Sequence, residues 1–200
     1  MKKLGNATQM NRLFINEFIK EGMIVLDATL GKGSDALSLL EKIGSSGRLY
    51  GFDVQQEAIN YSETRLSSQG YENYELLCDS HEHIENHIKE AIDFAVFNLG
   101  YLPSYNKDIT TTARSTVSAM ESAFKLLKVG GLLMVTVYPG HQNGLEEARL
   151  LAQRIPQVDQ KVADILHYQF INQVNHPPFT YLIEKKNEGK LWNEHTTDKR

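Results

Sequence analysis

The sequence lacks the features of a membrane protein, of a disulfide-bonded secreted protein and of a strongly basic one. Its single cysteine, Cys78, cannot form an internal disulfide bond. No apolar run approaches the roughly 20 residues of a membrane span. Polar residues follow Met1-Lys2-Lys3, where a secretory signal would be apolar. These absences predict a cytoplasmic protein without a membrane partner.

An excess of positive charge is also lacking. The formal net charge of −4 produces no global basic field, so any nucleic acid would have to contact a local patch. The 200 residues suffice for one domain with a full core and leave little room for a separate substrate domain. We expect one domain over residues 1–186 and a polar, loosely ordered tail over residues 187–200.

The sequence does contain an alternation of short apolar runs and amphipathic segments. Apolar runs predict strands at residues 24–26, 48–52, 74–78, 94–97 and 132–137. Amphipathic spacing predicts helices at residues 8–21, 34–43, 55–68, 81–90, 113–127 and 145–154. Two further β-rich runs, 162–174 and 180–184, have no helix between them and should pair antiparallel. The predicted fold class is α/β, with a seven-stranded, mostly parallel sheet that ends in a C-terminal antiparallel hairpin.

Polar residues stand where four of the predicted strands end. Asp27, Asp53 and Asp79 close the first three strands, and Asn98 closes the fourth. In an open parallel sheet the carboxyl ends of the strands share one edge, and ligands bind there. We therefore expect these four side chains to line a ligand-binding rim.

A glycine loop follows the first strand. Gly31-Lys-Gly33-Ser-Asp-Ala36 fits the dinucleotide fingerprint G-x-G-x-x-A, and Asp53 follows Gly33 at the expected distance of about 20 residues. The loop alone does not distinguish NAD from S-adenosylmethionine. Asp27 favours S-adenosylmethionine, because an acid before the glycines can pair with its α-amino group but would repel a pyrophosphate. The predicted cofactor contacts are Asp27, Thr29, Gly31, Lys32, Gly33, Asp53, Gln55, Asp79, Ser80, His81 and Asn98.

Several stretches along the chain carry a family resemblance. They are 27–33 (Asp-Ala-Thr-Leu-Gly-Lys-Gly), 51–53, 78–81, 97–103 (Phe-Asn-Leu-Gly-Tyr-Leu-Pro), 137–141 (Val-Tyr-Pro-Gly-His) and 175–178. With them the chain, over roughly residues 11–185, resembles the small class I S-adenosylmethionine-dependent methyltransferases labelled "putative rRNA methylase". Members of that family methylate the wobble uridine of tRNA as tRNA 5-(aminomethyl)-2-thiouridine methyltransferases. The resemblance implies a Rossmann-like sheet with helices on both faces and, as partner, the anticodon region of tRNA. It also implies methyl transfer to the aminomethyl nitrogen, giving 5-methylaminomethyl-2-thiouridine.

The residues after the fourth and fifth strands suit an amine acceptor. An alkylamine must be neutral to attack, and Asn98 offers a carbonyl acceptor that orients the amine without favouring its cation as a carboxylate would. Aromatic side chains in this region could stack on a flipped base, and histidines could take up the released proton. We predict Asn98, Tyr101, Tyr138 and His141 as catalytic residues, and Tyr101, Tyr138, His176 and Phe179 as substrate-binding residues.

Each assignment has an alternative without a role in methyl transfer. Asp79, Ser80 and His81 could cap the following helix, and loop histidines are commonly solvated. His83 and His87 stand four apart, as metal ligands can, but no third ligand is evident, so we predict no metal. The acceptor could instead be rRNA or a small-molecule amine. An NAD(P)-binding reductase, a non-catalytic nucleotide-binding module and a homodimer also stay open.

Overall fold

Seven strands form a single sheet in the order β3-β2-β1-β4-β5-β7-β6. The computed structural model describes residues 5–99, 113–140 and 142–192. The strands are β1 (Ile24–Asp27), β2 (Arg48–Asp53), β3 (Tyr74–Cys78), β4 (Ile92–Leu99), β5 (Leu127–Val137), β6 (Ala163–Tyr168) and β7 (Phe179–Lys185). β1 to β5 pair in parallel, whereas β7 runs antiparallel to both β5 and β6. The predicted α/β class, the seven-stranded sheet and the C-terminal hairpin are confirmed.

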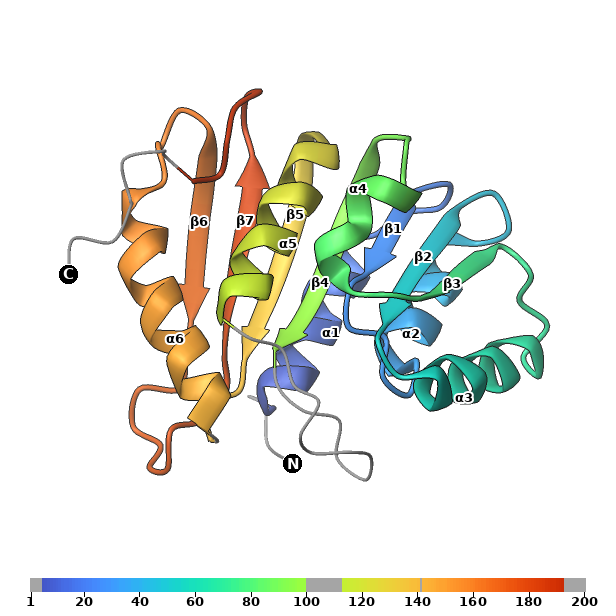
Figure 1. Ribbon diagram of the computed structural model, residues 1–200, viewed down its shortest axis with the longest axis horizontal. Coiled ribbons are helices and arrows are strands. Elements are labelled where there is room, and N and C mark those ends of the chain that lie inside the picture. Colours follow the sequence, from blue (N-terminus) through green and yellow to red (C-terminus); the bar gives the residue numbers. More distant parts are fainter. Residues whose placement is uncertain (1–4, 100–112, 141, 193–200) are drawn as a thin grey trace.

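Helices cover both faces of this sheet. They are α1 (Ala7–Phe18), α2 (Ser34–Ile43), α3 (Gln56–Ser67), α4 (Ile84–His87), α5 (Ala113–Leu126) and α6 (Gln142–Arg154). Two short 3-10 turns, η1 (His81–His83) and η2 (Ile155–Gln157), precede α4 and follow α6. Figure 1 shows α4, α5 and α6 in front of the sheet and α1 and α2 behind it. The side chains of α3 pack in the same apolar cluster as those of α1 and α2.

Burial on both faces explains the continuous apolar runs of the central strands, Ile24 to Leu26 in β1 and Phe94 to Phe97 in β4. In β1, Val25 packs into the cluster beneath α1 to α3, whereas its neighbour Leu26 packs into the cluster beneath α4 to α6. Phe94 and Ala95 divide between the same two clusters in β4. A parallel sheet that is covered on both faces needs such continuous apolar runs, since successive side chains point to opposite sides.

The predicted boundaries differ in two places: η1 and the four-residue α4 replace the single helix predicted over residues 81–90, and several bounds change in the C-terminal part of the chain. β5 begins at Leu127 and not at Leu132. The pairing of β4 with β5 changes register between Ile92 and Phe94 of β4. β6 ends at Tyr168, and bends and turns replace the last part of the β-rich run that was predicted to reach residue 174. By contrast, α2 and β3 have the bounds that the periodicity predicts.

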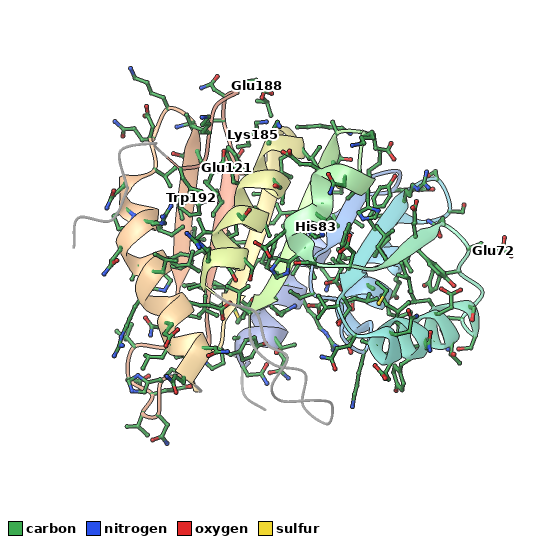
Figure 2. The ribbon with its side chains drawn as sticks, in the orientation of Figure 1. Glu72, His83, Glu121, Lys185, Glu188 and Trp192 are labelled. Atoms are coloured by element: carbon green, nitrogen blue, oxygen red, sulfur yellow. The ribbon has the colours of Figure 1, made fainter. Side chains whose placement is uncertain are left out.

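The segment after β7 corrects a further expectation. Leu191 and Trp192 are 1% and 9% exposed, respectively, and belong to the core. The backbone N–H of Trp192 donates to Glu121 Oε2 at 3.0 Å, and its indole Nε1 donates to the Val117 carbonyl at 3.0 Å, so the segment is fastened to α5 (Figure 2). The expectation of a loosely ordered polar tail is therefore wrong up to Trp192, because an indole that finds a polar partner can bury its large apolar surface.

None of the helices in the described residues is both long and apolar enough to cross a membrane. A cytoplasmic location stays a prediction.

Candidate cofactor and acceptor site

The glycine loop follows β1, whose last residue, Asp27, carries a buried carboxylate. Asp27 is 1% exposed, and its Oδ1 accepts a hydrogen bond from the Thr29 N–H at 3.2 Å. Gly31 and Gly33 have φ angles of 53° and 66°, a left-handed conformation that glycine adopts without steric cost. A Cβ on Gly33 would lie 2.9 Å from Ser62 Oγ, so the close approach of α3 also requires a glycine there.

Two side chains of α3 hold this loop, and the sequence reasoning missed both. The Ser62 hydroxyl donates to the Gly31 carbonyl at 3.0 Å, and Arg65 Nη1 donates to the Lys32 carbonyl at 2.8 Å. Ser62 is fully buried on the inward side of α3. A serine and an arginine in an amphipathic helix carry no sequence signal for a partner about thirty residues away, so only the folded arrangement identifies them.

Asp53 joins the end of β2 to the same loop. Its Oδ2 accepts from the Gly31 N–H and its Oδ1 from the Gln55 N–H, both at 2.9 Å. Burial raises the pKa of Asp53, while these backbone N–H groups counteract the shift. Gln55, which is 7% exposed, is the residue that precedes α3. The loop and Asp53, a predicted cofactor contact, are therefore one connected unit.

The charges at this rim fit a cationic cofactor. Burial raises the pKa of Asp27 well above its usual range, and the negative charges of Asp35 and Asp53 raise it further. An ammonium or sulfonium group beside these carboxylates would offset their mutual repulsion and favour the ionised form of Asp27. A pyrophosphate would add to the repulsion. These three acidic side chains therefore fit S-adenosylmethionine better than a nicotinamide dinucleotide.

Asn98 lies at the same rim, near the end of β4. Its backbone N–H donates to Thr29 Oγ1 at 2.7 Å, and its side-chain Nδ2 donates to Asp35 Oδ2 at 2.7 Å. These bonds place Asn98 next to the glycine loop, as predicted, but the sequence reasoning did not include Asp35. An acid in the first turn of a helix is common because it complements the helix dipole, so its position alone did not single it out.

Asp79 is engaged by two histidines in this structure. Its Oδ1 lies 2.8 Å from His83 Nδ1 and its Oδ2 lies 2.8 Å from His87 Nε2; Figure 2 labels His83. The hydrogen bonds from His83 and His87 lower the pKa of Asp79 to about 2, and the bond to Asp79 raises the pKa of His83. Ser80 Oγ accepts from the Glu82 N–H at 3.2 Å, which is the helix-capping role of the alternative interpretation. The cofactor contacts predicted for Asp79 and Ser80 stay predictions.

His81 occupies a different environment from its neighbours. It is 8% exposed, with its ring centroid 5.9 Å from that of Phe97, and it hydrogen-bonds to the backbone of Ala28. Burial lowers its pKa, so the ring is neutral near pH 7. Within the described part of the chain its buried Nε2 has no hydrogen-bond partner. The loops after β1 and β3 thus meet at this ring.

The predicted acceptor residues are only partly brought together. Tyr138 is half-buried, its side chain hydrogen-bonds to Thr8 of α1, and its backbone N–H donates to the Leu99 carbonyl at 3.3 Å. Phe179, 8% exposed, packs edge-to-face on His167 at 5.1 Å and on Tyr181 at 5.5 Å between ring centroids. His176 is exposed, with a left-handed φ of 50°. Tyr101 and His141 lie outside the described residues.

A buried polar cluster, also missed, ties α1 to the C-terminal strands. Asn11 is 2% exposed; its Nδ2 donates to Thr136 Oγ1 at 2.7 Å, and its Oδ1 accepts from the Tyr168 hydroxyl at 2.6 Å and from Thr180 Oγ1 at 3.1 Å. These partners come from β5, β6 and β7. The cluster holds α1 against the sheet, so that Thr8 reaches Tyr138.

A search for groups of three or more histidine, cysteine or acidic side chains able to hold a metal ion finds none in the described ranges. The two histidines with metal-like spacing, His83 and His87, converge on Asp79 instead.

The parallel sheet, the glycine loop and the acids at the carboxyl ends of its strands define a class I S-adenosylmethionine-dependent methyltransferase. Residues 49–184 match the family described as "Putative rRNA methylase", and the chain belongs to this family. The family and the cofactor predicted from the sequence are both confirmed, and the nicotinamide alternative is set aside.

Individual relatives agree with this assignment. A chloroplastic tRNA (mnm(5)s(2)U34)-methyltransferase of Arabidopsis thaliana is 30% identical over 197 residues, which cover 90% of this chain and 70% of the relative. A "putative rRNA-methylase" structure from Clostridium thermocellum superposes with a TM-score of 0.89 at 35% identity, covering 92% of this chain and all of the other. A methyltransferase of Streptococcus mutans in complex with S-adenosylhomocysteine (SAH) has a TM-score of 0.82 at 31% identity, with 91% and 99% of the two chains covered. The protein is thus an S-adenosylmethionine-dependent RNA methyltransferase.

Proposed function

We propose that the protein methylates the aminomethyl nitrogen of wobble 5-aminomethyl-2-thiouridine in tRNA, giving 5-methylaminomethyl-2-thiouridine. The observation that carries this proposal is the similarity to the Arabidopsis enzyme named for that position, which extends through 90% of the chain. The match covers both the cofactor-binding strands and the C-terminal strands, where an acceptor would be recognised.

In this proposal the first three strands hold the cofactor. When bound, S-adenosylmethionine would supply an activated methyl group: in-line attack by an amine nitrogen would form the new N–C bond as the C–S bond breaks and S-adenosylhomocysteine leaves. Asp27 pairs with the α-amino group, and the backbone of the loop from Thr29 to Gly33 lies along the cofactor. Asp53 and Gln55 bind the ribose, and residues 79–81 bind the adenine. The burial of Asp27 beside two other carboxylates supports the first of these roles.

The acceptor nitrogen meets the chain at Asn98. A free alkylamine is mostly protonated at pH 7, since its pKa resembles the value of about 10.4 for lysine. A neutral amide acceptor orients such a nitrogen without stabilising the cation as strongly as a carboxylate would. Tyr101, Tyr138 and Phe179 contribute aromatic surface for the base, and His141 or His176 takes up the proton. The position of Asn98 beside the loop, through its bond to Thr29, supports its role.

One observation favours a second acceptor class. A ribosomal RNA small subunit methyltransferase H of Dictyoglomus thermophilum is 32% identical, but only over 87 residues, or 42% of this chain and 29% of the relative. That match is shorter than the one to the tRNA enzyme, so rRNA remains the second candidate.

The test uses RNA that lacks the modification. tRNA and ribosomal subunits from cells without this gene are incubated separately with the protein and methyl-labelled S-adenosylmethionine, and the nucleosides are analysed by mass spectrometry. Label on the wobble nucleoside of tRNA supports the proposal. Label on rRNA alone, or on neither RNA, contradicts it.

A further inference from the structure

The side chain of Asn98 is held by Asp35, a residue that the sequence did not single out. Asp35, in the first turn of α2, accepts a hydrogen bond from Asn98 Nδ2 at 2.7 Å across 63 residues of sequence. This distance is short for an N–H···O bond and typical of one to a charged acceptor. The bond joins the helix after the glycine loop to the end of β4.

Chemistry determines which end of the amide faces Asp35. An ionised carboxylate has lone pairs but no hydrogen to donate, so it can bind only the NH₂ end of an asparagine amide. The carbonyl Oδ1 lies on the other branch of the same planar group and must point away from Asp35. Without the carboxylate, the NH₂ and carbonyl ends could exchange places by a rotation about χ2 at little cost.

The backbone at Asn98 does not depend on this bond. Asn98 pairs with Thr136 in the ladder between β4 and β5, and its N–H donates to Thr29 Oγ1 at 2.7 Å. Removing the carboxylate therefore frees the side-chain amide alone. A helix-dipole role would place an acid at Asp35 but would not require a contact with β4.

We propose that Asp35 is a positioning residue, which orients the Asn98 amide so that its carbonyl, and not its NH₂ group, faces the acceptor nitrogen. This inference rests on the proposed function in that the acceptor is an amine. A carbonyl accepts a hydrogen bond from an amine N–H and leaves the nitrogen lone pair directed at the methyl group. An NH₂ group in the same place would donate to that lone pair and block its attack.

The kinetic test is a double-mutant cycle with Asp35→Asn, Asn98→Ala and the double variant. Asn at position 35 keeps the size of the side chain but can bind either end of the Asn98 amide. At saturating cofactor, kcat of Asp35→Asn falls roughly tenfold or more, as for loss of an orienting charge-assisted hydrogen bond. KM for the RNA and Kd for SAH change little. In the Asn98→Ala background, Asp35→Asn has no additional effect on kcat. Glu41→Gln, the same change at an exposed position of α2, serves as the matched control and leaves kcat unchanged.

A second readout needs no substrate. The side-chain amide signals of Asn98 are identified in a ¹⁵N–¹H NMR spectrum by their absence in Asn98→Ala. Their proton and nitrogen shifts move in Asp35→Asn and stay in place in Glu41→Gln, while the backbone signals of β4 are retained.

The outcomes separate this inference from the proposed function. If kcat of Asp35→Asn is unchanged, if its only effect is a weaker Kd for SAH, or if the two substitutions act independently, Asp35 does not act through Asn98. If wild-type protein labels no wobble nucleoside, the proposed function fails, and the NMR shifts still decide whether Asp35 holds the amide. If the NMR shifts of the Asn98 side-chain amide do not change in Asp35→Asn, the inference is overturned, whether or not the wild-type protein labels the wobble nucleoside.

Discussion

The two halves of the sheet are held together in different ways. The cofactor half, comprising β1 to β3 with α2 and α3, holds its loop by hydrogen bonds between residues 2 to 33 positions apart, such as Thr29 to Asp27 and Arg65 to Lys32. The acceptor half, comprising β4 to β7 with α5 and α6, is closed by the Asn11 cluster, whose bonds span 125 to 169 positions. The loop contacts of the cofactor half thus join elements that are near one another in the sequence, whereas the acceptor half needs segments from both ends of the chain.

The polar contacts of the two halves also differ in kind. Asp53 in the cofactor half binds backbone N–H groups, which every residue except proline supplies. Asn11, which closes the acceptor half, binds three side-chain hydroxyls, which only Ser, Thr or Tyr can supply. Substitutions should therefore separate cofactor binding from the later steps, and four of them test this contrast.

The largest effect is expected at the boundary between the halves. Asn98→Ala removes the carbonyl that we propose orients the acceptor, and methyl transfer should fall about 100-fold, the scale for loss of one oriented hydrogen bond in a transition state. Kd for SAH by calorimetry stays nearly unchanged, because Thr29 still binds the backbone N–H of residue 98. Asn86→Ala, at an exposed position of α4, is the control and changes neither quantity. A parallel loss of SAH affinity in Asn98→Ala would assign the residue to the cofactor half.

Disruption of the Asn11 cluster is expected to affect the acceptor half alone. Asn11→Leu removes three hydrogen bonds from the buried cluster and lowers the free energy of unfolding by about 2 kcal/mol. Asn16→Leu, an exposed position of the same helix, changes it by less than about 0.5 kcal/mol. Urea unfolding with and without SAH measures both effects. The stabilisation by SAH should be equal in the two variants, and a smaller one in Asn11→Leu would show that the halves are coupled.

A pair of glycine substitutions tests the cofactor half. Gly33 and Gly70 have φ angles of 66° and 80°, but only at Gly33 would a Cβ meet another atom, Ser62 Oγ at 2.9 Å. Both alanine variants lose about 1 kcal/mol of stability from the left-handed backbone. Gly33→Ala also displaces the loop and weakens SAH binding about tenfold, equivalent to about 1.4 kcal/mol. Equal SAH affinities for the two variants would contradict the role of the loop.

The smallest effect concerns the histidines at the outer edge of the cofactor half. The bond to Asp79 raises the pKa of His83, so Asp79→Asn should return the His83 titration, followed by NMR, to the usual value of about 6.5. Because the folded pKa of His83 is raised, its contribution to stability is present below about pH 6.5 and is lost as the pH rises through the folded value. Asp79 has its pKa lowered to about 2, so its contribution is present above about pH 4 and lost as the pH falls toward 2. Glu72→Gln, an exposed carboxylate, leaves the titration of His83 unchanged.

The same contrast explains what could be predicted from the sequence. α2 and β3 have their predicted bounds, because apolar periodicity and flanking turn residues are local signals. Asp27, Asp53 and Asn98 could be assigned to one rim, because the parallel topology places strand ends together. Ser62, Arg65 and Asp35 could not be assigned to the site from the sequence, because their hydrogen-bond partners depend on how α2 and α3 pack.

The C-terminal part of the acceptor half was the least predictable. Asn11 resembles any polar residue on an amphipathic helix until β5, β6 and β7 are in place around it. Trp192 stands in a polar segment, and its burial depends on Glu121 and Val117, more than seventy positions earlier. No pattern within a single element encodes such a contact.

The position of β7 within the sheet has a consequence for biosynthesis. β7, the last strand in the described part of the chain, lies between β5 and the edge strand β6, so β6 has no place in the sheet until residue 185 has been made. β1 to β4, by contrast, are complete by residue 99 and can pair while the remainder is being translated. Contacts between distant segments form late, and unpaired strands are exposed until they do. We therefore expect the cofactor half to assemble first, and the acceptor half to close only after residues 179–185 have been made.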